Sequence, residues 1–342
     1  AGPIGAVEQY LFDKSYDNSE IEKLMPEILK GCEQVLYPIG KKNGFDQSVI
    51  DWTTDARSKD RHSKTINILD ASSLIGNARL IKDDHEISLI RIACDISAEA
   101  HIEAMKNVKD ADSEQDIESL YIHEFSKNGG RFQAYTPIVA SGENACVLHY
   151  TENNKKFNKK DLLLVDAGCE YEMYASDITR TYPISGKFSK EQLKIYEIVL
   201  EAMNAAIDKV KVGNNIMEPQ EISEKIITKG LVKLGLLEGD PEKLLKEGAF
   251  KDFYMHKIGH WLGLDVHDAG DYMEGDEFIK YKPGMITTIE PGIYISSSMD
   301  VDDKWKGIGV RIEDDILVTK EGNENLTKKV PSKPDENESL MS

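Results

Sequence analysis

Acidic side chains stand at the ends of apolar runs in this sequence. Asp166 directly follows the run Leu162–Val165, and Asp177 comes eleven residues later in the segment Ser176–Arg180. A carboxylate that continues a buried strand costs free energy unless a positive group compensates it. Taken singly, each aspartate is more typical of a turn or cap residue.

The same pattern recurs in the C-terminal part of the chain. Glu290 closes the run Met285–Ile289, and Glu313 lies in the segment Val310–Asp314. Alternation of side chains along a strand places Arg311 and Glu313 on one face. Four converging carboxylates would repel one another and raise their own pKa values unless a divalent metal lies between them. The acidic residues together therefore predict a metal site.

Histidines add a second type of ligand. His256, His260 and His267 fall within twelve positions, beside glycines that allow close backbone approach. A lone histidine in an apolar stretch is more often a satisfied core residue, but three together favour a site. His149, in Val147–Thr151, is a fourth candidate, but it is equally well interpreted as an ordinary histidine of a strand.

Helices and strands alternate in blocks around these residues. Helical spacing and the cap pairs of Ser113 with Asp116 and Ser189 with Gln192 predict helices near 20–30, from 83 onward, and at 113–129, 189–213 and 219–235. Runs rich in Ile, Val, Leu, Thr and Tyr predict strands at 161–168, 171–183, 285–295 and 309–319. This order favours an α+β domain that begins near residue 78 and has two related halves. The polar segment 328–342 is expected to be a loose tail.

Length and composition limit the function classes. The chain has 342 residues, with 42 basic and 61 acidic side chains, so its formal charge is 42 − 61 = −19. This charge repels phosphate backbones, and nucleic acid is not expected as a partner. No apolar run approaches the roughly 20 residues that cross a bilayer, so no transmembrane segment is expected. The four cysteines form no C-x-x-C pair, and the start at Ala1–Pro3 is expected to be a processed or truncated end.

The order of the five candidate ligands resembles the dinuclear metal site of the aminopeptidase P, prolidase and methionine aminopeptidase superfamily, whose fold is called pita-bread. Six segments carry the resemblance to aminopeptidase P in particular: 148–153, 166–171, 176–181, 260–268, 290–294 and 309–315. The similarity runs from about residue 78 to about residue 327. It is greatest to the mitochondrial branch, which includes the X-Pro aminopeptidase 3 type and the fungal intermediate-cleaving peptidase.

The resemblance implies a truncated N-terminal remnant in front of the catalytic domain. Residues 1–77 would be the C-terminal part of the aminopeptidase P N-terminal domain, 78–327 the catalytic pita-bread (creatinase/aminopeptidase) domain and 328–342 the loose tail. Relatives use their longer N-terminal domain to build oligomers, so a homodimer is one expectation. A second departure is Lys257, which stands where the family usually has glycine.

The resemblance also assigns metal ligands. It implies that Asp177 and Glu313 bridge two divalent metals, while Asp166 completes the shell of one metal. His260 and Glu290 would complete the shell of the other. This oxygen-rich set favours Mn²⁺, with Co²⁺ or Zn²⁺ as alternatives. Two adjacent cations would activate a shared water and polarise the scissile carbonyl.

Further roles come from the same resemblance. The implied catalytic group is Glu290, His256, His267 and Arg311. The residues implied to contact substrate are His149, His256, His267 and Tyr294. Glu290 would carry protons as well as bind metal, and the two histidines common to both groups would stabilise the oxyanion or orient the peptide. Arg311 would fix Glu313 from outside the metal shell.

The implied function is that of a metalloaminopeptidase of EC class 3.4.11, which releases one N-terminal residue from peptides or proteins. Xaa-Pro cleavage, trimming of mitochondrial proteins after presequence removal, or both are compatible with the resemblance. It implies a mitochondrial location, with the cytoplasm as the alternative. Prolidase, which accepts only dipeptides, is the closest rival. A creatinase-like enzyme without metal and a non-catalytic peptide-binding or chaperone module are disfavoured because all five ligands are present.

Overall fold

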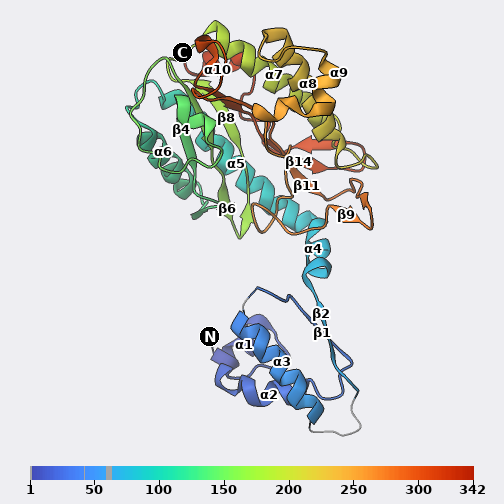
Figure 1. Ribbon diagram of the computed structural model, residues 1–342. Helices are drawn as coiled ribbons and strands as arrows, with labels where there is room; N and C mark the ends of the chain where they lie inside the picture. The colour runs from blue at the N-terminus through green and yellow to red at the C-terminus, as the bar shows by residue number, and fades with distance from the viewer. Residues whose placement is uncertain (1, 42, 59–63) are drawn as a thin grey trace. The chain divides into compact units, whose positions relative to one another are not determined.

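The computed structural model describes residues 2–41, 43–58 and 64–342, and the chain forms two compact units (Figure 1). Unit 1 covers Ala1–Ile75 and unit 2 covers Gly76–Ser342. The border lies within helix α4 (Ser72–Leu80), close to the border that the sequence predicts near residue 78. No helix among the described residues has the length and apolar character needed to cross a membrane.

Unit 1 packs helices against a two-stranded parallel ladder. Its helices are α1 (Gly2–Tyr10), α2 (Ile21–Ile28) and α3 (Asn43–Ser58), and its strands are β1 (Gln34–Tyr37) and β2 (Asn67–Asp70). Trp52 belongs to its core, and the indole N–H donates to Glu22 Oε2 at 2.7 Å, which joins α3 to α2. Helix α2 confirms the helix predicted near residues 20–30.

The first half of unit 2 combines two helices with antiparallel sheets (Figure 1). The helices are α5 (Asp84–Asn107) and α6 (Glu114–Lys127), and α6 begins at the capping box of Ser113 and Asp116 that the sequence predicts. The main sheet has the order β4–β5–β8 and a smaller one has the order β3–β6–β7. The strands are β3 (Phe132–Gln133), β4 (Ile138–Ser141), β5 (Leu162–Asp166), β6 (Cys169–Tyr171), β7 (Tyr174–Ala175) and β8 (Thr179–Pro183).

The second half repeats the plan of a helix pair with antiparallel strands. Helix α7 (Lys190–Ile207) packs against α8 (Glu218–Leu234), and α9 (Pro241–Glu247) follows. The ladders are β11–β14–β15, β12–β13 and β9–β10. The strands are β9 (Met273–Glu274), β10 (Glu277–Phe278), β11 (Ile286–Ile289), β12 (Gly292–Ile295), β13 (Ile308–Arg311), β14 (Asp314–Val318) and β15 (Asn323–Asn325). Both halves combine helices with antiparallel ladders, so the expected α+β class is confirmed.

Three long strands predicted from the sequence are interrupted at acidic residues. Asp177 lies between β7 and β8, Glu290 between β11 and β12, and Glu313 between β13 and β14. A continuous ladder would send successive side chains to opposite faces. The interruptions release these three residues from that alternation, and their carboxylates turn toward one region.

The expectation of a loose tail at 328–342 is wrong. The segment ends in helix α10 (Pro334–Leu340), and the side chains of Val330 and Met341 are buried in the core of the first half. Two buried polar groups hold it: the Arg180 guanidinium donates to backbone carbonyls of the tail, and the tail's Asn337 donates to the Tyr196 hydroxyl at 3.0 Å. The low apolar content of the segment led to the wrong prediction, because a few buried side chains are enough to fix it in position.

Candidate metal centre

Asp166 and Asp177 come from neighbouring parts of the first half. Asp166 is the last residue of β5, and Asp177 lies just before β8. The hydroxyl of Tyr135 lies between the two carboxylates, 2.6 Å from Asp166 Oδ1 and 2.5 Å from Asp177 Oδ1. The Asp177 backbone N–H donates to Asp315 Oδ2 at 3.0 Å, which fixes the chain at this point.

Glu290 and Glu313 come from the second half. The backbone N–H of Glu290 donates to Ile258 O at 2.8 Å, directly after β11. Glu313 is tied to Thr179 of β8 twice, because its N–H donates to the Thr179 carbonyl at 3.0 Å and its Oε2 accepts from Thr179 Oγ1 at 2.5 Å. Thr179 therefore joins the first half to the second half at the site.

His260 presents one ring nitrogen to the carboxylates. Its Nδ1 lies 3.0 Å from Trp261 O, so Nδ1 carries the proton and Nε2 is left as the ligand atom. Nε2 lies 3.4 Å from Asp177 Oδ2 and 3.6 Å from Glu290 Oε1. The backbone N–H of His260 donates to Thr288 Oγ1 at 3.0 Å, which anchors the residue to β11.

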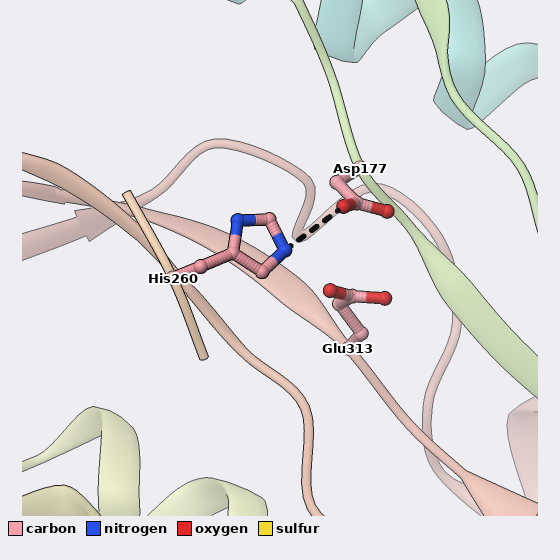
Figure 2. A group of neighbouring side chains, drawn as sticks. All are labelled: Asp177, His260 and Glu313. Atoms are coloured by element: carbon pink, nitrogen blue, oxygen red, sulfur yellow. Dashed lines mark ion pairs between the residues drawn. The ribbon is translucent and has the colours of Figure 1, made fainter. Parts of the chain in front are cut away.

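Three of the five predicted ligands form a tight group (Figure 2). One ligand atom from each of Asp177, His260 and Glu313 lies within 4.8 Å of the others, and Figure 2 shows the imidazole edge directed at the two carboxylates. Glu290 adjoins His260, and Asp166 adjoins Asp177 through Tyr135. Carboxylate oxygens with one imidazole are a hard donor set, so the residues present fit divalent metals.

Burial and mutual repulsion act on the carboxylates of this group. Burial raises the pKa of Glu290 to about 7, and burial together with the charge of Asp177 raises the pKa of Glu313 well above its usual range. Burial and the charge of Asp166 raise the pKa of Asp177 as well. Burial opposes the charged form of His260, but the hydrogen bond and charge of Asp177 outweigh it and raise the pKa of the ring to about 9. The site therefore holds more negative than positive charge, and a bound cation would reduce the repulsion.

Arg311 does not hold the carboxylate that the sequence predicts. Its guanidinium pairs with Asp166 Oδ2 at 2.6 Å and also donates to the hydroxyls of Tyr294 and Thr179, at 3.1 and 3.2 Å. It reaches Glu313 only through the Thr179 hydroxyl. The expectation of a direct Arg311 contact is wrong because Glu313 lies past the end of β13, where strand alternation no longer applies.

His256 and Tyr294 form a chain of hydrogen bonds beside the metal ligands, and His256 also lines the cavity. Arg311 donates to the Tyr294 hydroxyl, which lies 2.8 Å from His256 Nε2, and His256 Nδ1 lies 2.8 Å from the Lys257 carbonyl. Both ring nitrogens of His256 therefore have protein partners. Burial, helped by the charge of Arg311, lowers the pKa of His256 to about 4. Tyr294 is buried and absent from the residues that line the cavity, so its predicted substrate contact is not seen.

The metal group forms one wall of an open cavity of about 880 Å³. His149, His267 and Lys257 also line the cavity, and all three are exposed. The ring of His267 packs edge-to-face against His260, with centroids 4.3 Å apart. The apolar part of the lining is made by Ile138, Leu148, Met217, Val266 and Phe278.

Tyr135 is a site residue that the sequence analysis missed. It follows β3 in a segment without charged residues, and it belongs to none of the segments that carry the family resemblance. Thr179 lies in the segment around Asp177, but its residue type alone predicted no role in the site. The roles of both residues depend on hydroxyl positions that residue spacing does not encode.

Comparison with known proteins places the chain in a family. The sequence pattern described as Metallopeptidase family M24 matches residues 88–320. A Xaa-Pro aminopeptidase from Haemophilus influenzae is 44% identical over 336 residues, which cover 98% of this chain and 76% of the relative.

Solved structures agree with the sequence comparison. The aminopeptidase PepP of Pseudomonas aeruginosa superposes with a TM-score of 0.95 at 45% identity, covering 100% of this chain and 78% of that one. Zinc-substituted Escherichia coli aminopeptidase P in complex with product gives a TM-score of 0.95 at 41% identity, covering 99% and 78% of the two chains. The expected pita-bread fold and the expected enzyme class are confirmed. The chain therefore belongs to metallopeptidase family M24, in its aminopeptidase P group.

Proposed function

We propose that this protein is an Xaa-Pro aminopeptidase that releases one N-terminal residue from peptides and protein N-termini, with two Mn²⁺ ions as its native metals. The observation that carries the proposal is the convergence of four carboxylates and one imidazole on the wall of an open cavity. Two of the similar proteins, from Haemophilus influenzae and Escherichia coli, carry the name Xaa-Pro aminopeptidase, which supports the reaction type.

The five ligands would together hold two metals. Asp177 and Glu313 would lie between the metals, Asp166 would complete one shell, and His260 with Glu290 would complete the other. When bound, the metals supply Lewis acidity toward a water molecule and the scissile carbonyl group. The carboxylate oxygens outnumber the single ring nitrogen, which favours Mn²⁺ over a metal that prefers softer ligands.

Glu290 is placed to move a proton during peptide cleavage. Its two oxygens lie 3.6 Å from His260 Nε2 and 3.8 Å from His256 Nδ1, at the cavity wall. A carboxylate in this position can take a proton from the attacking water and return it to the departing amine. Neither step requires the residue to leave its place between the two histidines.

His267 and His149 are placed to contact the peptide. Neither ring is hydrogen-bonded to another residue in the described part of the chain, and both line the cavity. An N–H group without a protein partner is free to donate to the oxyanion of the tetrahedral intermediate. His256 differs, because both of its ring nitrogens already have partners. We therefore place His256 as a support for Glu290 and Tyr294.

The lining favours peptides longer than dipeptides. Apart from histidines, the basic side chains among the described lining residues are Lys257 and Arg311. Arg311 is already paired with Asp166 at 2.6 Å. Recognition of a dipeptide carboxylate next to the scissile bond calls for basic groups dedicated to it, and the lining offers no free pair.

The test is to incubate purified protein and Mn²⁺ with Ala-Pro-Ala, Ala-Ala-Ala, the dipeptide Ala-Pro and N-acetylated Ala-Pro-Ala, and to identify products by mass. Release of alanine from Ala-Pro-Ala alone is expected, and Asp177→Asn protein serves as the inactive control. Cleavage of the dipeptide alone would identify a prolidase. Cleavage of the acetylated peptide would contradict an aminopeptidase.

We extend the proposal to mitochondrial trimming on the strength of the sequence resemblance to the mitochondrial branch. In that role the enzyme would also remove Tyr, Leu or Phe from N-termini without a following proline. A Tyr-Ala-Ser peptide compared with an Arg-Pro-Pro peptide separates the two activities, and exclusive cleavage before proline would remove the trimming role. Fractionation of cells that express the protein would test the mitochondrial location, and light scattering of the purified protein would test the homodimer.

A further inference from the structure

We propose that Asp268, held by a buried ion pair with Lys82, is a positioning residue that keeps His267 over the metal centre during turnover. The inference rests on the proposed function, because it concerns how one residue of that site is held. It adds a requirement outside the group of ligands and histidines described above.

The ion pair is fully enclosed in unit 2. Lys82 Nζ lies 2.9 Å from Asp268 Oδ2, and the exposed fractions of the two side chains are 1% and 0%. A second cation, Arg79, pairs with the other oxygen of Asp268 and also with Asp265 Oδ2 at 2.8 Å. Both carboxylate oxygens of Asp268 therefore have a cationic partner, which satisfies a buried charge.

The pair fixes one end of the loop that carries His267. The loop runs from Leu262 to Asp268, and the backbone N–H groups at its two ends donate to Ile286 O at 3.1 Å and Trp261 O at 2.9 Å. Between these ends the loop passes closely over the pair. A Cβ placed on Gly263 would lie 2.2 Å from Asp268 Oδ2 and 2.9 Å from Lys82 Cε, so the loop backbone packs directly on the ion pair.

His267 depends on this loop for its position. Its side chain is exposed to the cavity, and no hydrogen bond holds its ring to another residue among those that the structure describes. The ring packs edge-to-face against the ligand His260. A side chain without polar anchors follows its backbone, and the adjacent residue Asp268 is the most strongly anchored point of that backbone.

The consequence for catalysis follows from geometry. A displacement of about 1 Å can cost on the order of a hundredfold in rate when a group must meet a developing charge. Loss of the Asp268 anchor would leave the metal ligands in place, because His260 is held separately by Thr288 and Trp261. The expected defect is therefore in turnover rather than in metal binding.

A double-mutant cycle tests this dependence on metal-loaded protein. Asp268→Asn is made alone and together with His267→Ala, and kcat, KM and bound metal are measured for each. Asp95→Asn is the matched control. Asp95 lies on helix α5, and the change removes an exposed ion pair in which the Asp95 carboxylate lies 2.6 Å from Lys329 Nζ. We expect Asp268→Asn to lower kcat by about tenfold or more, with KM and metal content near those of the control. In the His267→Ala background the same change is expected to lower kcat less than about threefold.

Other outcomes overturn the inference. An equal loss of kcat in both backgrounds would show that Asp268 acts independently of His267, and loss of metal would show that it supports the ligands. If Asp268→Asn does not fold, Arg79→Met replaces it, because Arg79 is 26% exposed and its loss leaves the Lys82 pair intact. Arg79→Met is expected to lower kcat by less than Asp268→Asn does, and to leave kcat unchanged in the His267→Ala background.

A crystal structure separates this inference from the proposed function. If His267→Ala itself leaves kcat unchanged, the role of His267 in the proposed function fails. The metal-loaded Asp268→Asn protein then decides the positioning inference alone. A His267 ring displaced from His260 supports it, and an unmoved ring refutes it.

Discussion

Replacing Asp177 by asparagine is the change that most directly tests the metal centre. The residue is 5% exposed, and its carboxylate accepts from Tyr135 at 2.5 Å and lies 3.4 Å from His260 Nε2. Asparagine has nearly the same shape but no charge, and one of its two terminal atoms becomes a donor. The substitution therefore removes a proposed bridge between two metals with little change of volume.

The size of the effect follows from the proposed role of Asp177 as a ligand that both metals would share. Changing a residue that merely orients a ligand typically lowers metal affinity by about 10- to 100-fold. Asp177 is itself a proposed ligand of both metals, so we expect its loss to weaken metal affinity by at least about 100-fold, or about 2.7 kcal/mol. Activity should fall with metal occupancy, since the Lewis acidity is lost at the same time.

The stability of the metal-free protein should change little. Burial and the charge of Asp166 raise the pKa of Asp177, so its ionised form destabilises the folded state at neutral pH. Asparagine removes that charge. It also removes the ion pair with His260, which offsets the relief of repulsion. We therefore expect the metal-free Asp177→Asn protein to melt close to metal-free wild type, while Mn²⁺ stabilises only the wild type.

The assay combines elemental analysis after dialysis with thermal melts in EDTA and in Mn²⁺. Full occupancy of both metals in the Asp177→Asn protein would refute its assignment as a ligand. A large fall in the melting temperature of the metal-free variant would refute the argument from charge repulsion. The Asp95→Asn protein is the control, because Asp95 is half exposed and pairs only with Lys329 in the described structure.

Four further predictions concern other parts of the molecule. His267→Ala should keep its metal by elemental analysis while kcat falls about 100-fold, as for loss of an oxyanion donor, and loss of metal would make it a ligand. Tyr135→Phe should weaken metal affinity about 10- to 100-fold in a competition titration, since it orients two ligands; unchanged affinity would contradict this role. In the folded protein the pKa values of Glu290 and His260 are raised to about 7 and about 9. Their contribution to stability is therefore complete at pH values below their pKa values in the unfolded chain, and it is lost as the pH rises through the folded-state pKa values. Metal-free protein should thus melt lower at pH 9 than at pH 6, and the reverse order would be inconsistent with these shifts. Val330→Ala should lower the free energy of unfolding by about 2 kcal/mol in urea titrations, and no change would mean that the tail is loose in solution.

Much of the fold could be predicted because local signals agree with the final structure. The helix predicted at 219–235 appears as Glu218–Leu234, followed by Gly235 with a φ of 73°. The capping boxes at Ser113 and Ser189 begin α6 and α7 as expected. The strand breaks at the acidic residues could not be predicted, since the apolar runs continue through them and only tertiary contacts stop the ladders.

The candidate site was predictable as a set of residue types but not as a geometry. Carboxylates at strand ends and clustered histidines pointed to a metal site, and the family resemblance assigned its five ligands, of which Asp177, His260 and Glu313 form the tight group. The predicted partner of Arg311 was wrong because it depended on where a strand ends. Tyr135 was missed because its position depends on how a loop folds back. Residue spacing carries neither kind of information.

Metal binding and proton release are coupled at this site for a structural reason. Among the described residues, Arg311 is the permanent cation that contacts the ligand carboxylates directly, and its ion pair is with Asp166. Burial and the remaining negative charges raise the pKa values of Asp177, Glu290 and Glu313, so the metal-free site holds protons at neutral pH. A divalent ion must displace those protons to bind, which makes metal affinity fall as pH falls. Tyr135, Thr179 and Arg311 hold the carboxylates close together, so the fold maintains their mutual repulsion. A bound cation would remove that repulsion, and this gain would contribute to metal affinity.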